Sequence, residues 1–211
     1  MTRIVAGSAK GRTLAVPKSG TRPTSERVRE ALFSRLDHMN VLHGATVLDL
    51  FTGTGALGLE ALSRGAARAT LVERASAAAR VATANVRATG LPAHVVTADA
   101  RTYLAARSSD TLEGEVDLVF IDPPYDIAEE DMTEVLSGLA PWIGPDSLVL
   151  VERSTRVPPP SWPTFLVLED ARTWGETVVY FAGPPLPEEH ERGDSDGCGG
   201  APASSGEEHD R

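Results

Sequence analysis

The chain has 211 residues, of which 41% are hydrophobic and 24% are charged, a composition typical of one globular domain with small appendages. The sequence contains no run of about 18 apolar residues that could span a bilayer. Residues 1–7 lack the apolar region of a signal peptide, so we expect a cytoplasmic protein with no membrane partner. The single cysteine excludes an internal disulfide, and the five histidines show no metal-ligand spacing, so no metal is predicted.

The net charge of −10 is unevenly distributed along the chain. Residues 1–40 carry eight basic and three acidic side chains, whereas the remainder of the chain is acidic. Charge acts locally, through the surface that carries it. We therefore predict a basic extension over residues 1–40, one large domain over residues 41–182, and an acidic, disordered tail over residues 183–211.

The N-terminal extension begins with two short runs of β type. The glycine-bounded segment 7–11 between them predicts a hairpin. Prolines then break regular structure over residues 17–23. The next residues predict a helix that is capped by Thr24 or Ser25. Its apolar stripe, which faces a core, is formed by Val28, Leu32 and Leu36.

Between residues 43 and 182, apolar runs alternate with segments of helical length, which predicts βαβ units and a mostly parallel sheet covered on both faces. The five alternating runs cover residues 45–50, 70–73, 95–98, 116–122 and 147–152. Two last runs, 165–168 and 177–181, leave no room for a crossover helix and are expected to pair antiparallel. The predicted fold is α/β: a seven-stranded, mostly parallel sheet ending in an antiparallel hairpin, as in Rossmann-like class I methyltransferases, with an N-terminal β-hairpin extension.

A glycine-rich loop joins the first of these strands to its helix. Gly53, Gly55 and Gly58 have the G-x-G-x-x-G spacing, which lets backbone approach a ligand at a helix N-terminus. This spacing alone fits a dinucleotide or S-adenosylmethionine. Asp49 ends the preceding apolar strand, where a carboxylate suits a cationic amino-sulfonium ligand better than a pyrophosphate. We therefore predict S-adenosylmethionine as the cofactor, with Phe51 of the same loop in its site.

Acidic residues also end the next two strands. Glu73 is placed to hydrogen-bond ribose hydroxyls, a feature that NAD sites share. Asp99 is placed to accept from the adenine amino group, with the Ala100 backbone against the ring. An N-cap role for Asp99 in a following helix is equally consistent with the sequence.

The fourth strand runs directly into Asp122, Pro123, Pro124 and Tyr125, at the sheet end where open α/β sheets bind ligands. An exocyclic base amine is a poor nucleophile because its lone pair is delocalised into the ring. The Asp122 carboxylate and the Pro123 carbonyl can accept its hydrogen bonds, and Tyr125 can stack on the base. We predict these four as the catalytic residues, which aim the amine at a sulfonium methyl, with Asp122 also bordering the cofactor.

From about residue 3 to residue 182, the chain resembles the RsmD family of small-subunit ribosomal RNA guanine-N2 methyltransferases. The resemblance rests on residues 3–7 and 10–12, on residues 22–30 and 49–63, and on the tetrapeptide 122–125. It implies methylation of one guanine at N2 in 16S ribosomal RNA, in the 30S subunit or an assembly intermediate. It also implies that the N-terminal extension assists RNA binding.

The predicted RNA contacts combine the basic extension with a segment before the last strand, because phosphate binding needs clustered cations. Where relatives resemble Lys-x-Tyr-Gly, this chain has Arg-Thr-Trp-Gly at residues 172–175, which keeps a cation and an aromatic ring. Trp174 could equally pack on the rim of the sheet, and we expect Arg35 to be a solvated surface residue. The predicted RNA-binding residues are Arg3, Lys10, Arg12, Arg22, Arg27, Arg29, Arg172 and Trp174.

Other functions share parts of this pattern. A DNA adenine-N6 methyltransferase uses the same tetrapeptide but usually a separate target-recognition domain, for which this chain is too short. A protein-glutamine methyltransferase faces the same delocalised nitrogen. A non-catalytic assembly factor would not need Asp49, Asp122 and Tyr125, and an NAD-dependent oxidoreductase leaves the tetrapeptide unexplained. We expect a monomeric enzyme that acts on 16S ribosomal RNA.

Overall fold

The computed structural model describes residues 2–16, 26–106 and 116–185. Arg22 and the predicted caps Thr24 and Ser25 lie outside these residues, as does the predicted tail apart from residues 183–185. Among the helices of the described ranges, none combines the length and the apolar character needed to cross a membrane.

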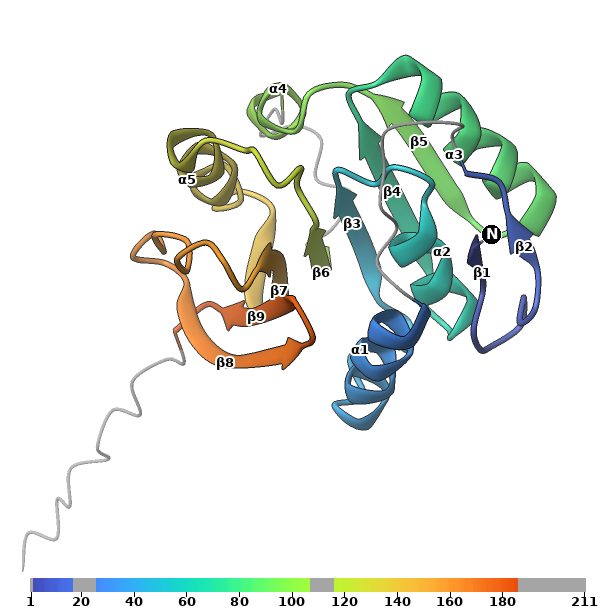
Figure 1. The fold of residues 1–211 in the computed structure, drawn as a ribbon, viewed down its shortest axis with the longest axis horizontal. Coiled ribbons are helices and arrows are strands. Elements are labelled where there is room, and N and C mark those ends of the chain that lie inside the picture. Colours follow the sequence, from blue (N-terminus) through green and yellow to red (C-terminus); the bar gives the residue numbers. More distant parts are fainter. Residues whose placement is uncertain (1, 17–25, 107–115, 186–211) are drawn as a thin grey trace, which may run out of the picture.

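A seven-stranded sheet forms the centre of the molecule, in the order β5-β4-β3-β6-β7-β9-β8 (Figure 1). The strands from β5 to β7 are parallel, β9 runs antiparallel to β7, and β8 runs antiparallel to β9. The strands are β3 (Thr46–Leu50), β4 (Arg68–Glu73), β5 (Ala93–Thr97), β6 (Val116–Ile121), β7 (Ile143–Ser154), β8 (Val167–Trp174) and β9 (Thr177–Gly183). The predicted α/β fold, with its parallel sheet and antiparallel end, is confirmed.

The last two strands are longer than predicted, and only Gly175 and Glu176 connect them. Gly175 has a φ of 64°, a left-handed conformation that tight hairpin turns need and that glycine adopts at little cost. β8 exposes most of its side chains and is mainly polar after Leu168, so the predicted apolar run 165–168 covers only its start.

Helices cover both faces of the sheet (Figure 1). The helices are α1 (Glu26–His38), α2 (Ala56–Ser63), α3 (Ser76–Thr89), α4 (Ala100–Ala105) and α5 (Glu129–Ser137). α1 and α2 pack on one face, in a core that includes Phe33 and Phe120. α4 and α5 pack on the opposite face, around Val119 and Met132.

The predicted N-terminal hairpin is formed by β1 (Thr2–Arg3) and β2 (Thr13–Leu14), which pair antiparallel. Its side chains Ile4 and Leu14 are 1% and 2% exposed and belong to the same core as α1 and α2. The hairpin is therefore packed against the helices that cover the sheet.

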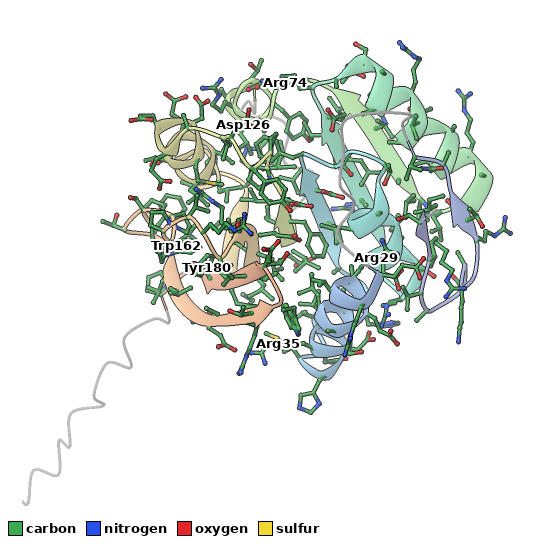
Figure 2. The ribbon with its side chains drawn as sticks, in the orientation of Figure 1. Arg29, Arg35, Arg74, Asp126, Trp162 and Tyr180 are labelled. Atoms are coloured by element: carbon green, nitrogen blue, oxygen red, sulfur yellow. The ribbon has the colours of Figure 1, made fainter. Side chains whose placement is uncertain are left out.

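The core-facing stripe of α1 includes an arginine where a valine was predicted. The buried residues of α1 are Arg29, Leu32, Phe33 and Leu36. Arg29 lies between α1 and α2 (Figure 2), where it donates to the Arg3 carbonyl and lies 3.8 Å from a Glu60 carboxylate oxygen. Burial lowers the pKa of Arg29, and Glu60 opposes that shift. Because its side chain is only 1% exposed, Arg29 has a structural role between the hairpin and α2, and its contact with RNA stays a prediction.

Candidate functional site

A cavity of about 820 Å³ lies at the carboxyl ends of the parallel strands. Each of the five strands from β5 to β7 brings one carboxylate to it. In sheet order these are Asp99, Glu73, Asp49, Asp122 and Glu152. These carboxylates lie at the same edge of the sheet, because the register pairs Leu50 of β3 with Ile121 of β6, and Ile121 with Val151 of β7. The sequence singled out the first four carboxylates and missed the fifth.

Asp49 is buried beneath the glycine loop, with 1% of its surface exposed. Its Oδ2 accepts hydrogen bonds from the Gly58 N–H at 3.0 Å and the Thr52 hydroxyl at 2.7 Å, whereas its Oδ1 is buried with no hydrogen-bond partner among the described residues. Burial raises the pKa of Asp49 to about 7, against the opposing effect of those two hydrogen bonds. An unpaired buried carboxylate oxygen is costly, so the site favours a ligand that brings a positive charge.

Two glycines of the loop are needed for different reasons. Gly53 has a φ of 54°, and a Cβ added there would lie in open space, with no atom within 4 Å. At Gly58 a Cβ would lie 2.3 Å from Leu71 Cδ2 and 3.3 Å from Asp49 Oδ2. Gly53 therefore permits the turn and leaves room above it, whereas Gly58 allows α2 to approach β4 and Asp49. Gly55, with a φ of 82°, is the N-cap of α2.

Phe51 lines the cavity with a φ of 64°, in the left-handed region that residues with a Cβ rarely adopt. Two backbone hydrogen bonds fix the residues that follow Phe51. The Thr52 N–H donates to the Val72 carbonyl at 3.0 Å, and the Gly53 N–H donates to Glu73 Oε2 at 2.9 Å. Such a conformation costs about 1–3 kcal/mol and is found mainly at ligand sites whose surroundings enforce it.

Glu73 and Asp99 both have defined structural partners. Besides the Gly53 N–H, Glu73 accepts from the Ala75 N–H at 2.7 Å. Asp99 accepts from the Arg101 N–H at 3.0 Å and is the N-cap of α4, which confirms that part of the prediction. Ala100 follows it on the cavity wall. Contacts of these residues with ribose and adenine stay predictions.

The predicted catalytic residues line the same cavity as the glycine loop. Asp122 is half-buried, Pro123 is buried, and Pro124 is exposed. A turn follows, in which the Ile127 N–H donates to the Pro124 carbonyl at 3.1 Å. Tyr125 is 66% exposed, so its ring stands at the cavity rim, where a flat molecule could reach it.

A second cavity, of about 1060 Å³, adjoins the first, since Tyr125 and Glu152 line both. Residues of α1, of β7 and of the turn between β8 and β9 complete its wall. It contains two predicted RNA-binding residues, Arg27 and Trp174, and one that the sequence missed, Arg156. Trp174 also packs on the core, which confirms the rim position that was predicted as the alternative, and its contact with RNA stays a prediction. A groove with two arginines, two glutamates and the rings of Tyr125 and Trp174 thus adjoins the tetrapeptide, and Arg156 pairs there with Glu176.

Of the other predicted RNA-binding residues that the structure describes, Arg29 borders the first cavity, and four lie outside the walls of both cavities. Arg3 pairs with Glu26 at 3.3 Å, Arg12 donates to the Ala88 carbonyl at 2.7 Å, and Lys10 is exposed on the hairpin. Arg172 is an exposed residue of β8 that pairs with Asp170 at 3.0 Å. The exposed residues that were predicted to contact RNA therefore lie in three places: the hairpin surface, the outer strand β8 and the second cavity.

Arg35 does not behave as the solvated residue that was expected. It pairs with Asp170 of β8, and its guanidinium carbon lies 4.9 Å from the centre of the Phe181 ring (Figure 2). This side chain therefore joins α1 to the antiparallel end of the sheet.

Comparison with known proteins gives a family match over nearly all of the described chain. The family model described as Conserved hypothetical protein 95 matches residues 2–183. The chain is 36% identical over 178 residues to ribosomal RNA small subunit methyltransferase D of Escherichia coli K12, covering 83% of this chain and 86% of that protein. A hypothetical protein of Thermus thermophilus has a solved structure with 31% sequence identity and a TM-score of 0.73, over 86% of this chain and 98% of that one.

A third relative has a substrate in its name whose chemistry can be compared with that of a base amine. The chain is 34% identical over 151 residues to 4-amino-L-phenylalanine/4-methylamino-L-phenylalanine methyltransferase of Streptomyces pristinaespiralis, covering 67% of this chain and 47% of that protein. The substrate named there bears an amine directly on an aromatic ring, so its lone pair is delocalised as in a base amine.

Proposed function

We propose a function from one premise: the chain belongs to the family described as Conserved hypothetical protein 95. The proposed reaction transfers a methyl group from S-adenosylmethionine to the exocyclic N2 amine of a guanine in 16S ribosomal RNA, in the 30S subunit or an assembly intermediate. The observation that supports it most is the shared cavity, which has the unpaired buried oxygen of Asp49 on one side and the tetrapeptide on the other.

The residues at the glycine loop fit the proposed cofactor. Asp49 offers a buried acceptor to a cation, Gly53 leaves open space, and Glu73 and Asp99 border the same cavity. When bound, S-adenosylmethionine supplies an electrophilic methyl group on a positively charged sulfur. Asp49, Glu73 and Asp122 give this cavity a negative potential, which favours that charge.

The tetrapeptide would orient the base amine. In this proposal, Asp122 and the Pro123 carbonyl accept the N–H bonds of the amine, and Tyr125 stacks on the base. Acceptors on both N–H bonds raise the electron density on nitrogen and fix the direction of its lone pair toward the methyl donor, so the contribution of the protein is orientation and electrostatic stabilisation. Asp122 then accepts the proton that the methylated amine releases, which does not require a strong base.

The test is transfer of radiolabelled methyl from S-adenosylmethionine to naked 16S RNA, 30S particles, DNA and free 4-amino-L-phenylalanine, followed by product analysis. We expect N2-methylguanosine in the ribosomal RNA. Asp122→Ala should lower the rate by at least about 100-fold, as for loss of an oriented polar group, and should weaken cofactor affinity by less than about tenfold, because Asp49 and Glu73 remain. The control is Asp146→Ala, which removes an exposed aspartate at the opposite end of β7. Label in N6-methyladenosine, in protein or in the free amine alone would overturn the assigned substrate.

A further inference from the structure

Glu152 lies between the two cavities and beside the tetrapeptide. The register of β6 and β7 pairs Ile121 with Val151, so the residues that follow, Asp122 and Glu152, are neighbours at the ends of adjacent strands. On its other side Glu152 pairs with Val179 of β9. The backbone of Glu152 is therefore held within β7 by its pairing with β9, unlike that of a loop residue.

The pleat of β7 determines where this side chain points. Leu148 and Leu150 belong to the core beneath α1 and α2, whereas Val149 and Val151 belong to the opposite core. Successive side chains of a strand point to opposite faces, so Glu152 projects to the same side as Leu150, toward α1. It is half-buried and borders the same two cavities as Tyr125.

Each carboxylate can accept several hydrogen bonds, so two adjacent ones suit a ligand that is rich in hydrogen-bond donors. Guanine has three such hydrogens on its Watson–Crick edge, one on N1 and two on N2. Adenine has an unprotonated N1 beside its amine, and the lone pair of that nitrogen would face the lone pairs of a carboxylate. Enzymes that act on a flipped base read this edge by hydrogen bonds, and unpaired or repelling groups provide the discrimination.

We propose that Glu152 selects guanine as the substrate base, by accepting the N1–H while Asp122 and the Pro123 carbonyl hold the N2 amine. This inference rests on the proposed function and adds the residue that separates guanine from adenine. In this role Glu152 contacts the base through a hydrogen bond, and no covalent bond of Glu152 forms or breaks. The same carboxylate would disfavour adenine-N6 methylation.

The first test compares Glu152→Gln and Glu152→Asp with the wild-type protein, on the RNA or particle in which wild type forms N2-methylguanosine. Glutamine keeps the size of the side chain but replaces one acceptor by a donor. We expect Glu152→Gln to lower kcat/KM by at least about 100-fold. Glu152→Asp, which keeps the carboxylate, should retain more activity than Glu152→Gln. Cofactor affinity should stay within about twofold of wild type in both.

The second test measures base preference directly. 16S RNA is assembled by ligation with guanosine or 2-aminopurine riboside at the mapped acceptor position, since 2-aminopurine keeps the amine but has an unprotonated N1. Wild type should prefer guanosine by at least about 100-fold, and this preference should shrink at least tenfold in Glu152→Gln, whose amide can donate to N1. The control is Glu169→Gln, an exposed residue of β8 outside both cavity walls, which should behave as wild type.

The outcomes separate the two proposals. If wild type forms no N2-methylguanosine, the proposed function fails and the role of Glu152 fails with it. If wild type forms it and Glu152→Gln keeps the wild-type rate, only the inference about Glu152 is overturned. A loss of rate with the wild-type base preference retained would also overturn it, because a purely structural role has that effect.

Discussion

The ionised carboxylate of Asp49 destabilises the folded protein by itself but favours binding of a cationic ligand. The pKa of Asp49 is raised from 3.8 to about 7 by burial, so between these values the folded protein holds a proton that the unfolded chain has lost. The contribution of this group to the free energy of unfolding therefore falls as the pH rises from about 4 to 7 and is constant above. A bound cation would favour the ionised form, so the ligand would offset the cost of burying this charge.

Asp49→Asn should stabilise the protein alone and weaken cofactor binding. The amide oxygen of asparagine can still accept from Thr52 and Gly58, and no charge has to be buried. At pH 8 we expect the free energy of unfolding to rise by about 1–3 kcal/mol, and its decline between pH 4 and 7 to flatten. Urea unfolding at several pH values measures both effects. A variant that is less stable than wild type at pH 8 would contradict this account.

The affinity of the wild-type protein for S-adenosylmethionine should depend on pH for the same reason. A group with a pKa of about 7 is mostly ionised at pH 8 and mostly protonated at pH 6, so the Kd should rise about tenfold on going from pH 8 to pH 6. Isothermal titration calorimetry measures it. Asp49→Asn serves as the control, and an equal pH dependence in that variant would assign the effect to another group.

At the level of elements, α2 joins the N-terminal hairpin to the glycine loop. Its N-terminus begins at the loop, and its later turns hold the hairpin. Glu60 accepts from the Val5 and Ala6 N–H groups at 2.7 and 3.0 Å, and Ser63 Oγ accepts from the Ala9 N–H at 2.9 Å. Because Glu60 is fully buried, these hydrogen bonds are shielded from water, and the hairpin is firmly attached to the helix that bounds the cofactor cavity.

A second link runs through α3. Asn85, 3% exposed, accepts from the Ala15 N–H at 2.8 Å and donates to the carbonyls of Ala15 at 3.0 Å and of Thr54 at 2.9 Å. One side chain thus connects the end of the hairpin with the glycine loop.

Asn85→Ala should therefore reduce both stability and cofactor affinity. It removes three hydrogen bonds to backbone groups, of which the one to the Thr54 carbonyl is buried, so the free energy of unfolding should fall by about 1–3 kcal/mol. Because Thr54 belongs to the loop, we expect the Kd for S-adenosylmethionine to rise several-fold in protein that is still folded at about 15 °C, near the usual temperature of maximum stability. The matched control is Arg80→Ala, an exposed position of the same helix. Unchanged cofactor affinity would show that the loop holds its shape without Asn85.

Over the whole molecule, opposite charges occupy different surfaces. Five carboxylates lie at the ends of neighbouring strands, whereas exposed cations include Lys10 and Arg12 on the hairpin and Arg27 beside the second cavity. A polyanion would be repelled by the first surface and attracted by the others, with Tyr125 between the two cavities. Only the target base, inserted past Tyr125, would then enter the acidic cavity.

Arg27→Ala should weaken RNA binding without affecting the cofactor. Arg27 is exposed and lines the second cavity, so its loss should raise the Kd for 16S RNA several-fold. The slope of log Kd against log salt concentration should fall by about 0.7 if one phosphate contact is lost from single-stranded RNA. Filter binding over a range of salt concentrations measures both quantities. Arg68→Ala, at the amino end of β4, makes the same charge change at the opposite end of the sheet. Equal effects of both variants would mean that only net charge matters.

The local patterns of the sequence determined much of this protein: the alternation of strands and helices, the glycine loop after Asp49 and the tetrapeptide after β6. Each is a run of adjacent residues whose spacing is the physical cause of its structure. Only the tertiary structure decided that Glu152 joins the other carboxylates, and that Arg27 and Trp174 lie near Tyr125. It also decided that Arg29 is buried. A strand-end glutamate and an arginine on a helix look like surface residues until distant partners are known. Burial and pairing are set by which elements pack together, and that information is not contained in any single segment.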